Sequence, residues 1–200
     1  MKIIGLCGGS GSGKGSVCEI FSELSVPSVD TDLVYRKMTL VDSSCMRALK
    51  REFGDEIANS DGSLNRVELR RLVFDSEDAK KNRKKLNAIS HKFILDETRR
   101  IIAEKEREGA KAIIIDAPLL FESGFDRECD VTACVIADED VRISRIILRD
   151  GISAADAKRR IEGQITNDEL VRLSDYVIEN NGDLDALRAQ VINLYKKIII

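Results

Sequence analysis

The chain has 200 residues, a formal net charge of −3 and a pI near 5.4. This length is enough for one sizeable hydrophobic core with a small inserted module. The acidic balance excludes a general attraction to nucleic acid, and no apolar run approaches the ~18 residues that cross a bilayer. Five cysteines without a Cys-x-x-Cys pair are typical of reduced thiols, and no signal peptide precedes the first strand, so we expect a cytoplasmic protein.

The first predicted element is a strand over Lys2–Cys7, whose β-branched bias is typical of a buried parallel strand. A glycine-rich stretch follows without a gap. In such a loop, backbone N–H groups converge on an oxyanion, the next helix points its positive end there, and Lys14 reaches the β- and γ-phosphates. A flexible linker is the alternative, but a linker would not lie between a strand and a helix. We therefore predict a nucleotide-binding loop made of Gly9, Ser10, Gly11, Ser12, Gly13, Lys14, Gly15 and Ser16.

One position departs from the usual pattern of such loops. The residue after the lysine is normally Ser or Thr, whose hydroxyl holds Mg²⁺, and here it is Gly15. Ser16 follows at once, and the order Gly-Lys-Gly-Ser resembles the loop of adenylate kinases. We expect Mg²⁺ to enter with ATP and name Ser16 and Asp32 as its candidate protein ligands.

Val17–Leu24 has the apolar spacing of a helix with one buried face, and Val26–Val29 is predicted to be a short strand. The strand is followed by Asp30 and Asp32. Because parallel strands share one carboxyl rim, we expect these aspartates beside the glycine loop. Asp32, with Asp30 as the alternative, would accept a proton from an acceptor hydroxyl, although a helix cap is the commoner role at such a position.

From Leu33 to about Arg107 the pattern is helical and highly charged, with a turn at Asn59–Gly62 and Gly109 as the expected end of a long helix. Basic side chains gather here in a chain that is acidic overall. Most of them fit a solvated helix face, and a few would be available to bind an anionic acceptor.

Three more strands are predicted, at Ala112–Asp116, Val131–Ile136 and Tyr176–Ile178, with helical patterns between them. A last helix follows the Asn181-Gly182 turn, with Ile198–Ile200 as its apolar end. The alternation of strands and helices predicts an α/β fold with a five-stranded parallel sheet flanked by helices and right-handed crossovers.

Arg145 and Arg149 precede Asp150-Gly151, and this arrangement is typical of a lid that closes over phosphates and excludes water. For either arginine alone, a surface salt bridge is the alternative. Phosphoryl transfer requires the nucleotide to be held, the developing charge to be neutralised and a hydroxyl to be placed in line. The loop, the arginines and the aspartates supply groups for each of these tasks, so the residues favour a kinase.

Several short patterns occur in a specific order. They are Gly8-Gly9-x-Gly11-Ser12-Gly13-Lys14, Val29-Asp30-Thr31-Asp32, Gly62-x-Leu64-Asn65-Arg66, Leu86-Asn87-x-Ile89-x-His91, Asp116-x-Pro118-Leu119-Leu120-Phe121-Glu122, Arg145-x3-Arg149, Arg160-Ile161-x-x-Gln164 and Asp175-x-Val177-Ile178-x-Asn180. In these patterns the chain resembles the dephospho-coenzyme A kinase family almost from end to end. The loop alone is common to many unrelated nucleotide-binding proteins, whereas the later patterns are specific.

That resemblance implies ATP-dependent phosphorylation of the ribose 3′-hydroxyl of dephospho-coenzyme A, the final step of coenzyme A synthesis. It implies a P-loop NTPase fold of the nucleoside-monophosphate-kinase type, a single domain over residues 1–200. A helical acceptor region over 33–108 and a lid over 145–165 would belong to it. The expected partners are the small molecules ATP, with Mg²⁺, and dephospho-coenzyme A, without nucleic acid or membrane, for a monomer or weak oligomer.

The resemblance also implies roles for single residues. Lys14, Asp32 and Arg145 would be catalytic, and Arg149 and Asn180 would contact ATP, Asn180 at the adenine. The residues implied in acceptor binding are Asp30, Asp32, Arg66, His91, Asp116, Pro118 and Leu119.

Two positions depart from the family pattern: Gly15, and Lys92 in place of the proline that normally follows the histidine. Without that proline the local helix is expected to start earlier. His91 is the single histidine of the chain, and a lone histidine on a helix is more often structural than catalytic. Two other functions stay open: a kinase for another small acceptor, such as a nucleoside monophosphate or shikimate, and a nucleotide-binding regulatory module without turnover.

Overall fold

A computed structural model of the chain describes residues 1–40 and 43–199. The chain forms two compact units, one made of Met1–Asp30 with Ile102–Ile200 and the other of Thr31–Ile101. The first unit contains the sheet and the second is helical. In the part of the chain that the structure describes, no helix is both long enough and apolar enough to cross a membrane.

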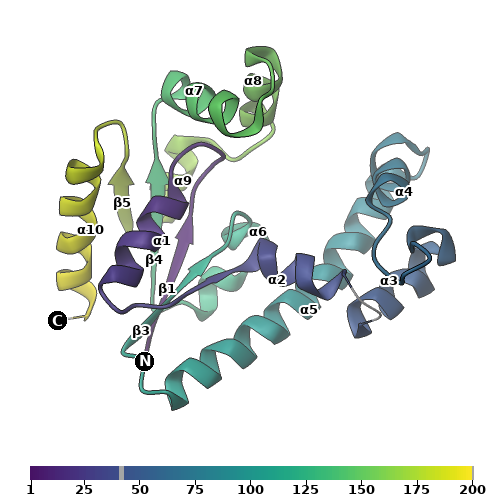
Figure 1. The fold of residues 1–200 in the computed structure, drawn as a ribbon, viewed down its shortest axis with the longest axis horizontal. Helices are drawn as coiled ribbons and strands as arrows, with labels where there is room; N and C mark the ends of the chain where they lie inside the picture. Colours follow the sequence, from purple (N-terminus) through teal and green to yellow (C-terminus); the bar gives the residue numbers. More distant parts are fainter. Residues whose placement is uncertain (41–42, 200) are drawn as a thin grey trace. The chain divides into compact units, whose positions relative to one another are not determined.

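The first unit is built on a five-stranded parallel sheet in the order β2-β3-β1-β4-β5 (Figure 1), which confirms the predicted fold class. From β1 the chain fills one side of the sheet with β2 and β3, and then the other side with β4 and β5. The loop after β1 therefore lies at the switch point, where α/β sheets bind ligands. The strands are β1 (Lys2–Cys7), β2 (Ser28–Asp30), β3 (Ala112–Asp116), β4 (Val131–Ile136) and β5 (Tyr176–Glu179).

Helices cover both faces of this sheet, as the buried apolar runs of its strands require. Helices α1 (Lys14–Glu23) and α10 (Leu184–Ile199) share one hydrophobic core with β1, β3, β4 and β5. On the opposite face, α6 (Leu120–Ser123) and the short 3₁₀ helix η3 (Phe125–Glu128) contact β1, and α9 (Asn167–Leu173) contacts β4. Cys7 and Cys134 are buried within the strands, as predicted.

Helices α7 (Glu139–Asp150) and α8 (Ala154–Glu162) lie near the carboxyl end of β4 in the first unit (Figure 1). They pack on each other through a small cluster that includes Ile146, Ala157 and Ile161. The predicted cap of α8 is present, because the Ser153 hydroxyl accepts a hydrogen bond from the backbone N–H of Asp156 at 3.1 Å.

The second unit has a hydrophobic core of its own, to which α3, α4 and the segments around them contribute. Ser43 and Asn65 cap α3 and α4 with their side-chain oxygens, which explains where these helices begin. The helical elements that start in this unit are α2 (Thr31–Met38), α3 (Ser44–Phe53), the 3₁₀ turn η1 (Asp55–Ile57), α4 (Arg66–Arg70), the π-helical turn η2 (Arg71–Asp75) and α5 (Ala79–Arg107).

The predicted helical pattern and its turns are confirmed, with one addition. Gly109 has φ +87° and follows the end of α5, and the Asn59–Gly62 turn is closed by a backbone hydrogen bond of 3.0 Å. Lys92 lies inside α5, which begins at Ala79. The π-helical turn was not predicted. Of the expected apolar end of α10, Ile198 and Ile199 are helical, and Ile200 lies outside the described residues.

Candidate functional site

The glycine loop joins β1 to α1 in the arrangement that its sequence predicts. Helix α1 begins at Lys14, and no side chain of the described residues caps its first turn at Gly13. The first N–H groups of a helix have no partner within the helix, and together with the helix dipole they favour an anion. This end of α1 therefore provides an anion-binding site at the carboxyl end of the central strand.

Close packing explains why the loop needs its glycines. Gly13 has φ +99°, and a Cβ atom there would lie 2.1 Å from the side-chain amide nitrogen of Asn180. At Gly11, with φ +78°, a Cβ atom would lie 2.6 Å from the carbonyl oxygen of Arg142. Gly15 is different, because a Cβ atom there would meet nothing within 4 Å. The structure thus requires glycine inside the loop but leaves room for a side chain at the position after the lysine.

Three arginines of α7 contact the loop. Their spacing of three and then four residues places them on one face of the helix. Arg142 donates from Nε to the Ser10 carbonyl at 2.9 Å, and Arg149 donates to the Ser10 hydroxyl at 3.3 Å. Arg145 donates to the carbonyls of Gly11 and Ser12 at 3.3 and 3.4 Å.

Arg142 is the buried member of this set, with 4 % of its surface exposed. Burial lowers the pKa of its guanidinium, since the charged form is partly desolvated. The amide oxygen of Gln164 accepts from Arg142 and from the Ser10 backbone N–H, both at 2.9 Å. Sequence analysis did not name Arg142 or Gln164 as site residues. The spacing of three residues from Arg145 and seven from Arg149, which places all three on one helix face, is the sequence signal that could have identified Arg142.

Asn180 holds the loop from the other side. Its side-chain nitrogen donates to the Ser12 carbonyl at 2.8 Å, and its oxygen accepts from Arg145 at 3.4 Å. Asn180 is buried and directly follows β5. Its contact with the loop was not foreseen, and the contact with adenine implied by the family stays a prediction.

Lys14 lies beside a carboxylate of the sheet. Its ammonium donates to the Gly8 carbonyl at 3.1 Å and lies 3.7 Å from a carboxylate oxygen of Asp116. The two side chains are only 14 % and 18 % exposed, so their attraction is weakly screened by solvent. Asp30 and Asp116 are paired in the register of β2 and β3, so both aspartates stand at the carboxyl ends of neighbouring strands, as predicted from the shared rim.

The thiol of Cys18 lies 4.0 Å from Asp116. Burial, followed by the negative charge of Asp116, raises its pKa to about 12. At neutral pH Cys18 is therefore a protonated thiol, and its place near Lys14 gives no nucleophile to the site.

The remaining predicted residues are distributed over both units. In the first, Ser16 lies in the opening turn of α1, and Pro118 and Leu119 lie between β3 and α6. In the second, Asp32 is in the first turn of α2, Arg66 begins α4 and His91 lies within α5. The first unit thus brings together the loop, Lys14, Asp116, the α7 arginines and Asn180.

This arrangement of the first unit can hold a polyphosphate. Backbone N–H groups, one lysine and the α7 arginines surround the start of α1, and all of them favour negative charge. Within residues 1–40 and 43–199, no group of three or more His, Cys, Asp or Glu side chains is placed to hold a metal ion. The candidate ligands, the Ser16 hydroxyl and the Asp32 carboxylate, are oxygen donors. Such donors suit Mg²⁺, which is commonly bound through one or two protein oxygens together with substrate phosphates.

Comparison with known proteins gives the same family that the short sequence patterns indicate, along most of the chain. A model of the family described as dephospho-CoA kinase matches residues 2–186. The dephospho-CoA kinase of Corynebacterium efficiens is 37% identical over 199 residues, which cover 100% of this chain and 98% of that protein. Among solved structures, TT1252 from Thermus thermophilus has a TM-score of 0.79 at 30% identity, covering 98% of this chain and 97% of that one. Dephospho-CoA kinase from Campylobacter jejuni shares the fold, with a TM-score of 0.72 at 22% identity and coverage of 100% and 98%. The chain belongs to the dephospho-CoA kinase family.

Proposed function

We propose that this kinase transfers the γ-phosphoryl group of ATP to the 3′-hydroxyl on the ribose of dephospho-coenzyme A, giving coenzyme A and ADP. The observation that carries the proposal is the glycine loop at the start of α1, held by Arg142, Arg145 and Asn180 at the sheet's switch point. The family membership supports dephospho-coenzyme A as the acceptor.

The loop residues Gly9–Ser16 would hold the ATP phosphates, with Lys14 at the β- and γ-phosphates. Arg145 and Arg149 would neutralise the charge that develops on the transferred group. The contacts of Arg145 with the loop carbonyls, at 3.3 and 3.4 Å, are longer than ordinary hydrogen bonds. Because charge-assisted bonds to phosphate are stronger, we expect Arg145 to exchange these contacts for the nucleotide.

Asp32 is the proposed base, with Asp30 as the alternative. The 3′-hydroxyl would give its proton to the carboxylate while its oxygen attacks the γ-phosphorus. The bond from that phosphorus to the β,γ-bridging oxygen breaks, and ADP leaves with the electron pair. The Ser16 hydroxyl and Asp32 would hold Mg²⁺, which when bound would supply positive charge at the phosphates. The residues proposed to bind the acceptor are Asp30, Asp32, Arg66, His91, Asp116, Pro118 and Leu119.

The direct test is transfer of labelled phosphate from ATP by the purified protein. We expect dephospho-coenzyme A to be the preferred acceptor in a panel with shikimate and nucleoside monophosphates, and the product to carry a 3′-monophosphate. Tight ATP binding without transfer to any acceptor would overturn the proposal in favour of a regulatory module. A clear preference for another acceptor would identify a different kinase.

Substitution of Asp32 tests the base. With Asp32→Asn we expect the transfer rate to fall about 10²-fold or more, since general-base catalysis contributes on that scale. Asp30→Asn is the comparison variant, because Asp30 is the alternative base, and it should slow the transfer less than Asp32→Asn does. If the Asp32→Asn rate stays within about threefold of wild type, less than 1 kcal/mol of barrier, the assignment of the base is wrong.

We also propose that the protein works in the cytoplasm, as a monomer or weak oligomer. All five cysteines have free thiols, and the buried Cys7 and Cys134 serve as core residues rather than disulfide partners. Cell fractionation and light scattering of the purified protein test these two points.

A further inference from the structure

The backbone of one residue of the glycine loop, Ser10, is held by side chains on both of its sides. The Ser10 N–H donates to the amide oxygen of Gln164 at 2.9 Å, and the Ser10 carbonyl accepts from Nε of Arg142, also at 2.9 Å. The same Gln164 oxygen accepts from Nη2 of Arg142 at 2.9 Å, so the three residues form a closed ring of hydrogen bonds. We call Ser10, Arg142 and Gln164 the Ser10 clamp.

The Ser10 clamp acts on a part of the loop that has little support of its own. Ser10 and Gly11 are the central residues of a turn, which is closed by a backbone hydrogen bond of 3.1 Å from the Ser12 N–H to the Gly9 carbonyl. Glycine loses more conformational freedom on folding than any other residue, and it occupies every second position from Gly9 to Gly15. If the loop had to become ordered only when ATP binds, part of the binding free energy would be lost. Side chains that fix the loop in advance therefore raise its affinity for phosphate.

The two side chains of the clamp come from a packed support. Arg142 lies near the start of α7 and is buried, and Gln164 follows the end of α8. The backbone N–H of Gln164 donates to the Ile161 carbonyl at 3.0 Å, which ties Gln164 to α8. Because α7 and α8 also pack on each other through their own apolar cluster, the clamp joins the loop to a pair of helices that is already in place.

Gly9 leaves the space that the clamp occupies. A Cβ atom at Gly9 would lie 2.2 Å from Nη2 of Arg142 and 3.0 Å from the side-chain oxygen of Gln164. Gly9 differs from Gly11 and Gly13 because its φ is not positive, so its backbone would accept another residue. The three atoms nearest to the added Cβ all belong to Arg142 and Gln164. The clamp, rather than the loop backbone, thus explains the glycine at this position.

We propose that Arg142 and Gln164 are positioning residues for ATP, which act through the Ser10 backbone and hold the glycine loop in the shape that the phosphates require. The inference rests on the proposed function, and it adds to it the effect of the clamp on ATP affinity and the reason for Gly9. Loss of either side chain should weaken the binding of ATP and leave the binding of the acceptor unchanged.

Steady-state kinetics separate positioning from a purely structural role. Gln164→Met keeps the length of the side chain but removes the oxygen that accepts both hydrogen bonds. We expect KM for ATP to rise about tenfold, with kcat and KM for dephospho-coenzyme A unchanged, because the lost interactions support binding rather than the transition state alone. A variant that merely folds less well would contain less active enzyme. Its kcat would fall while both KM values stayed the same, and that result would overturn the proposal.

A double-mutant cycle tests the coupling between Gly9 and Arg142. We expect Gly9→Ala and Arg142→Ala each to weaken ATP binding about tenfold, since a methyl group at position 9 would displace the guanidinium. The double variant should bind ATP no more weakly than Arg142→Ala, because the group that the methyl displaces is already absent. Independent effects would multiply to about a hundredfold and would overturn the proposal. Titration calorimetry with ATP, without acceptor, gives the dissociation constants.

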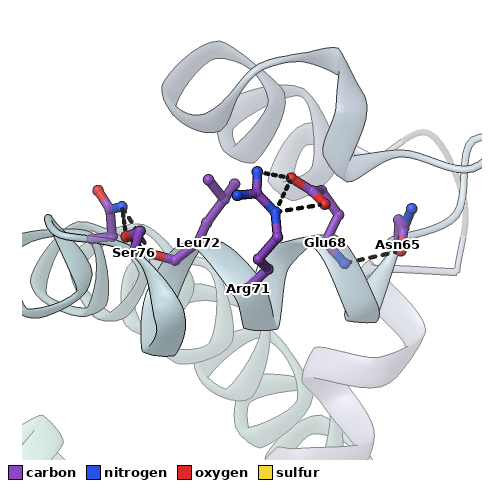
Figure 2. A network of polar contacts seen from close by, with 6 residues as sticks. Asn65, Glu68, Arg71, Leu72 and Ser76 are labelled. Carbon is purple, nitrogen blue, oxygen red and sulfur yellow. Dashed lines mark hydrogen bonds and ion pairs between the residues drawn. The ribbon is translucent and has the colours of Figure 1, made fainter.

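Arg71 provides the control for removal of an arginine. Its Nε donates to Glu68 at 3.0 and 3.1 Å (Figure 2), so its partner lies one turn away in the same segment rather than in the loop. Arg71→Ala should leave the ATP dissociation constant within about twofold of wild type, since an exposed ion pair of this kind contributes little. An equal loss of ATP binding in Arg71→Ala and Arg142→Ala would overturn the assignment to the clamp.

These measurements also separate failure of this inference from failure of the proposed function. If wild type phosphorylates dephospho-coenzyme A and Gln164→Met keeps the wild-type KM for ATP, the clamp does not position the loop and the proposed function stands. If wild type binds ATP, Gln164→Met binds it about tenfold more weakly and neither phosphorylates an acceptor, the clamp assignment stands and the proposed function fails.

Discussion

At the scale of single residues, the loop positions differ in what they tolerate. Inside the loop, Gly11 and Gly13 combine positive φ with close neighbours, and the space for a Cβ atom is already taken. Gly15 lies in the first turn of α1, where the backbone is helical and the surroundings are open. A glycine in a helix costs about 0.5–1 kcal/mol relative to alanine, so nothing in the fold favours it at that position.

The pair Gly13→Ala and Gly15→Ala tests this difference. We expect Gly13→Ala to lower the free energy of unfolding by about 2 kcal/mol, because left-handed strain adds to displacement of Asn180, and to abolish ATP binding. Gly15→Ala should raise the free energy of unfolding by about 0.5 kcal/mol. Urea denaturation and ATP titration measure both quantities, and equal stabilities of the two variants would contradict the close approach at Gly13.

Gly15→Ser tests the metal ligand that the loop lacks. The open surroundings accept the serine side chain, and its hydroxyl would reach the place where other loops of this type hold Mg²⁺. We expect the Mg²⁺ concentration for half-maximal activity to fall by roughly tenfold, the scale on which one supporting group changes metal affinity. An unchanged Mg²⁺ dependence would indicate that the Ser16 hydroxyl or water already fills this position.

At the scale of elements, α7 connects the loop to the rest of the first unit. Arg142 and Gln164 hold the Ser10 backbone, and Arg145 reaches both the loop and Asn180. At the other end of α7, the carboxylate of Asp150 pairs with Arg149 and with Arg160 of α8. These guanidinium groups lower the pKa of Asp150. The helix is therefore anchored at both ends, and the lid over 145–165 stays a prediction about how this segment responds to ATP.

Arg142→Ala tests the anchoring of α7. Removal of this buried side chain leaves the Ser10 carbonyl without its Arg142 donor and the Gln164 amide oxygen with the Ser10 N–H alone, so we expect a loss of about 2–3 kcal/mol in the free energy of unfolding. Arg149→Ala is the matched control, because Arg149 is exposed and pairs with Asp150, and its loss should cost less than about 1 kcal/mol. Denaturant unfolding curves compare the two, and equal losses would show that Arg142 is not an anchor.

At the scale of the whole molecule, each unit has its own hydrophobic core, and buried thiols contribute to both. Cys7 lies in β1, and burial raises the pKa of its thiol from 9.0 to about 12. The native state therefore keeps this proton at a pH where the unfolded chain has lost it. The contribution of the neutral thiol to stability is complete below pH 9 and is lost as the pH rises from 9 to about 12.

This linkage predicts how stability depends on pH. Between pH 9 and 11 the free energy of unfolding of wild type should fall more steeply than that of Cys7→Ala, by at most about 1.4 kcal/mol per pH unit. Val67→Ala, on the surface, should follow the wild-type slope. Urea denaturation at a series of pH values gives the slopes. Parallel curves for wild type and Cys7→Ala would show that Cys7 titrates normally in the folded protein.

The sequence predicted the parts of this protein that depend on local pattern. Apolar runs predicted the five strands, spacing predicted most helices, and the glycine loop with its lysine predicted an anion site between β1 and α1. The ordered short patterns identified the family, which the comparisons confirm. The roles assigned to Asp32, Arg66 and His91 stay predictions.

Contacts between residues far apart in the chain were decided only by the tertiary structure. Gln164 and Asn180 reach the loop across more than 150 residues, and no local signal marks such a pair. Two carbonyls of the π-helical turn accept hydrogen bonds from Asn82 and Arg83 of α5, so part of what stabilises the turn lies outside its own sequence. Periodicity and propensity describe a segment and its immediate neighbours along the chain. A side chain that bonds a distant backbone depends on how the elements pack, and that is settled only when the chain has folded.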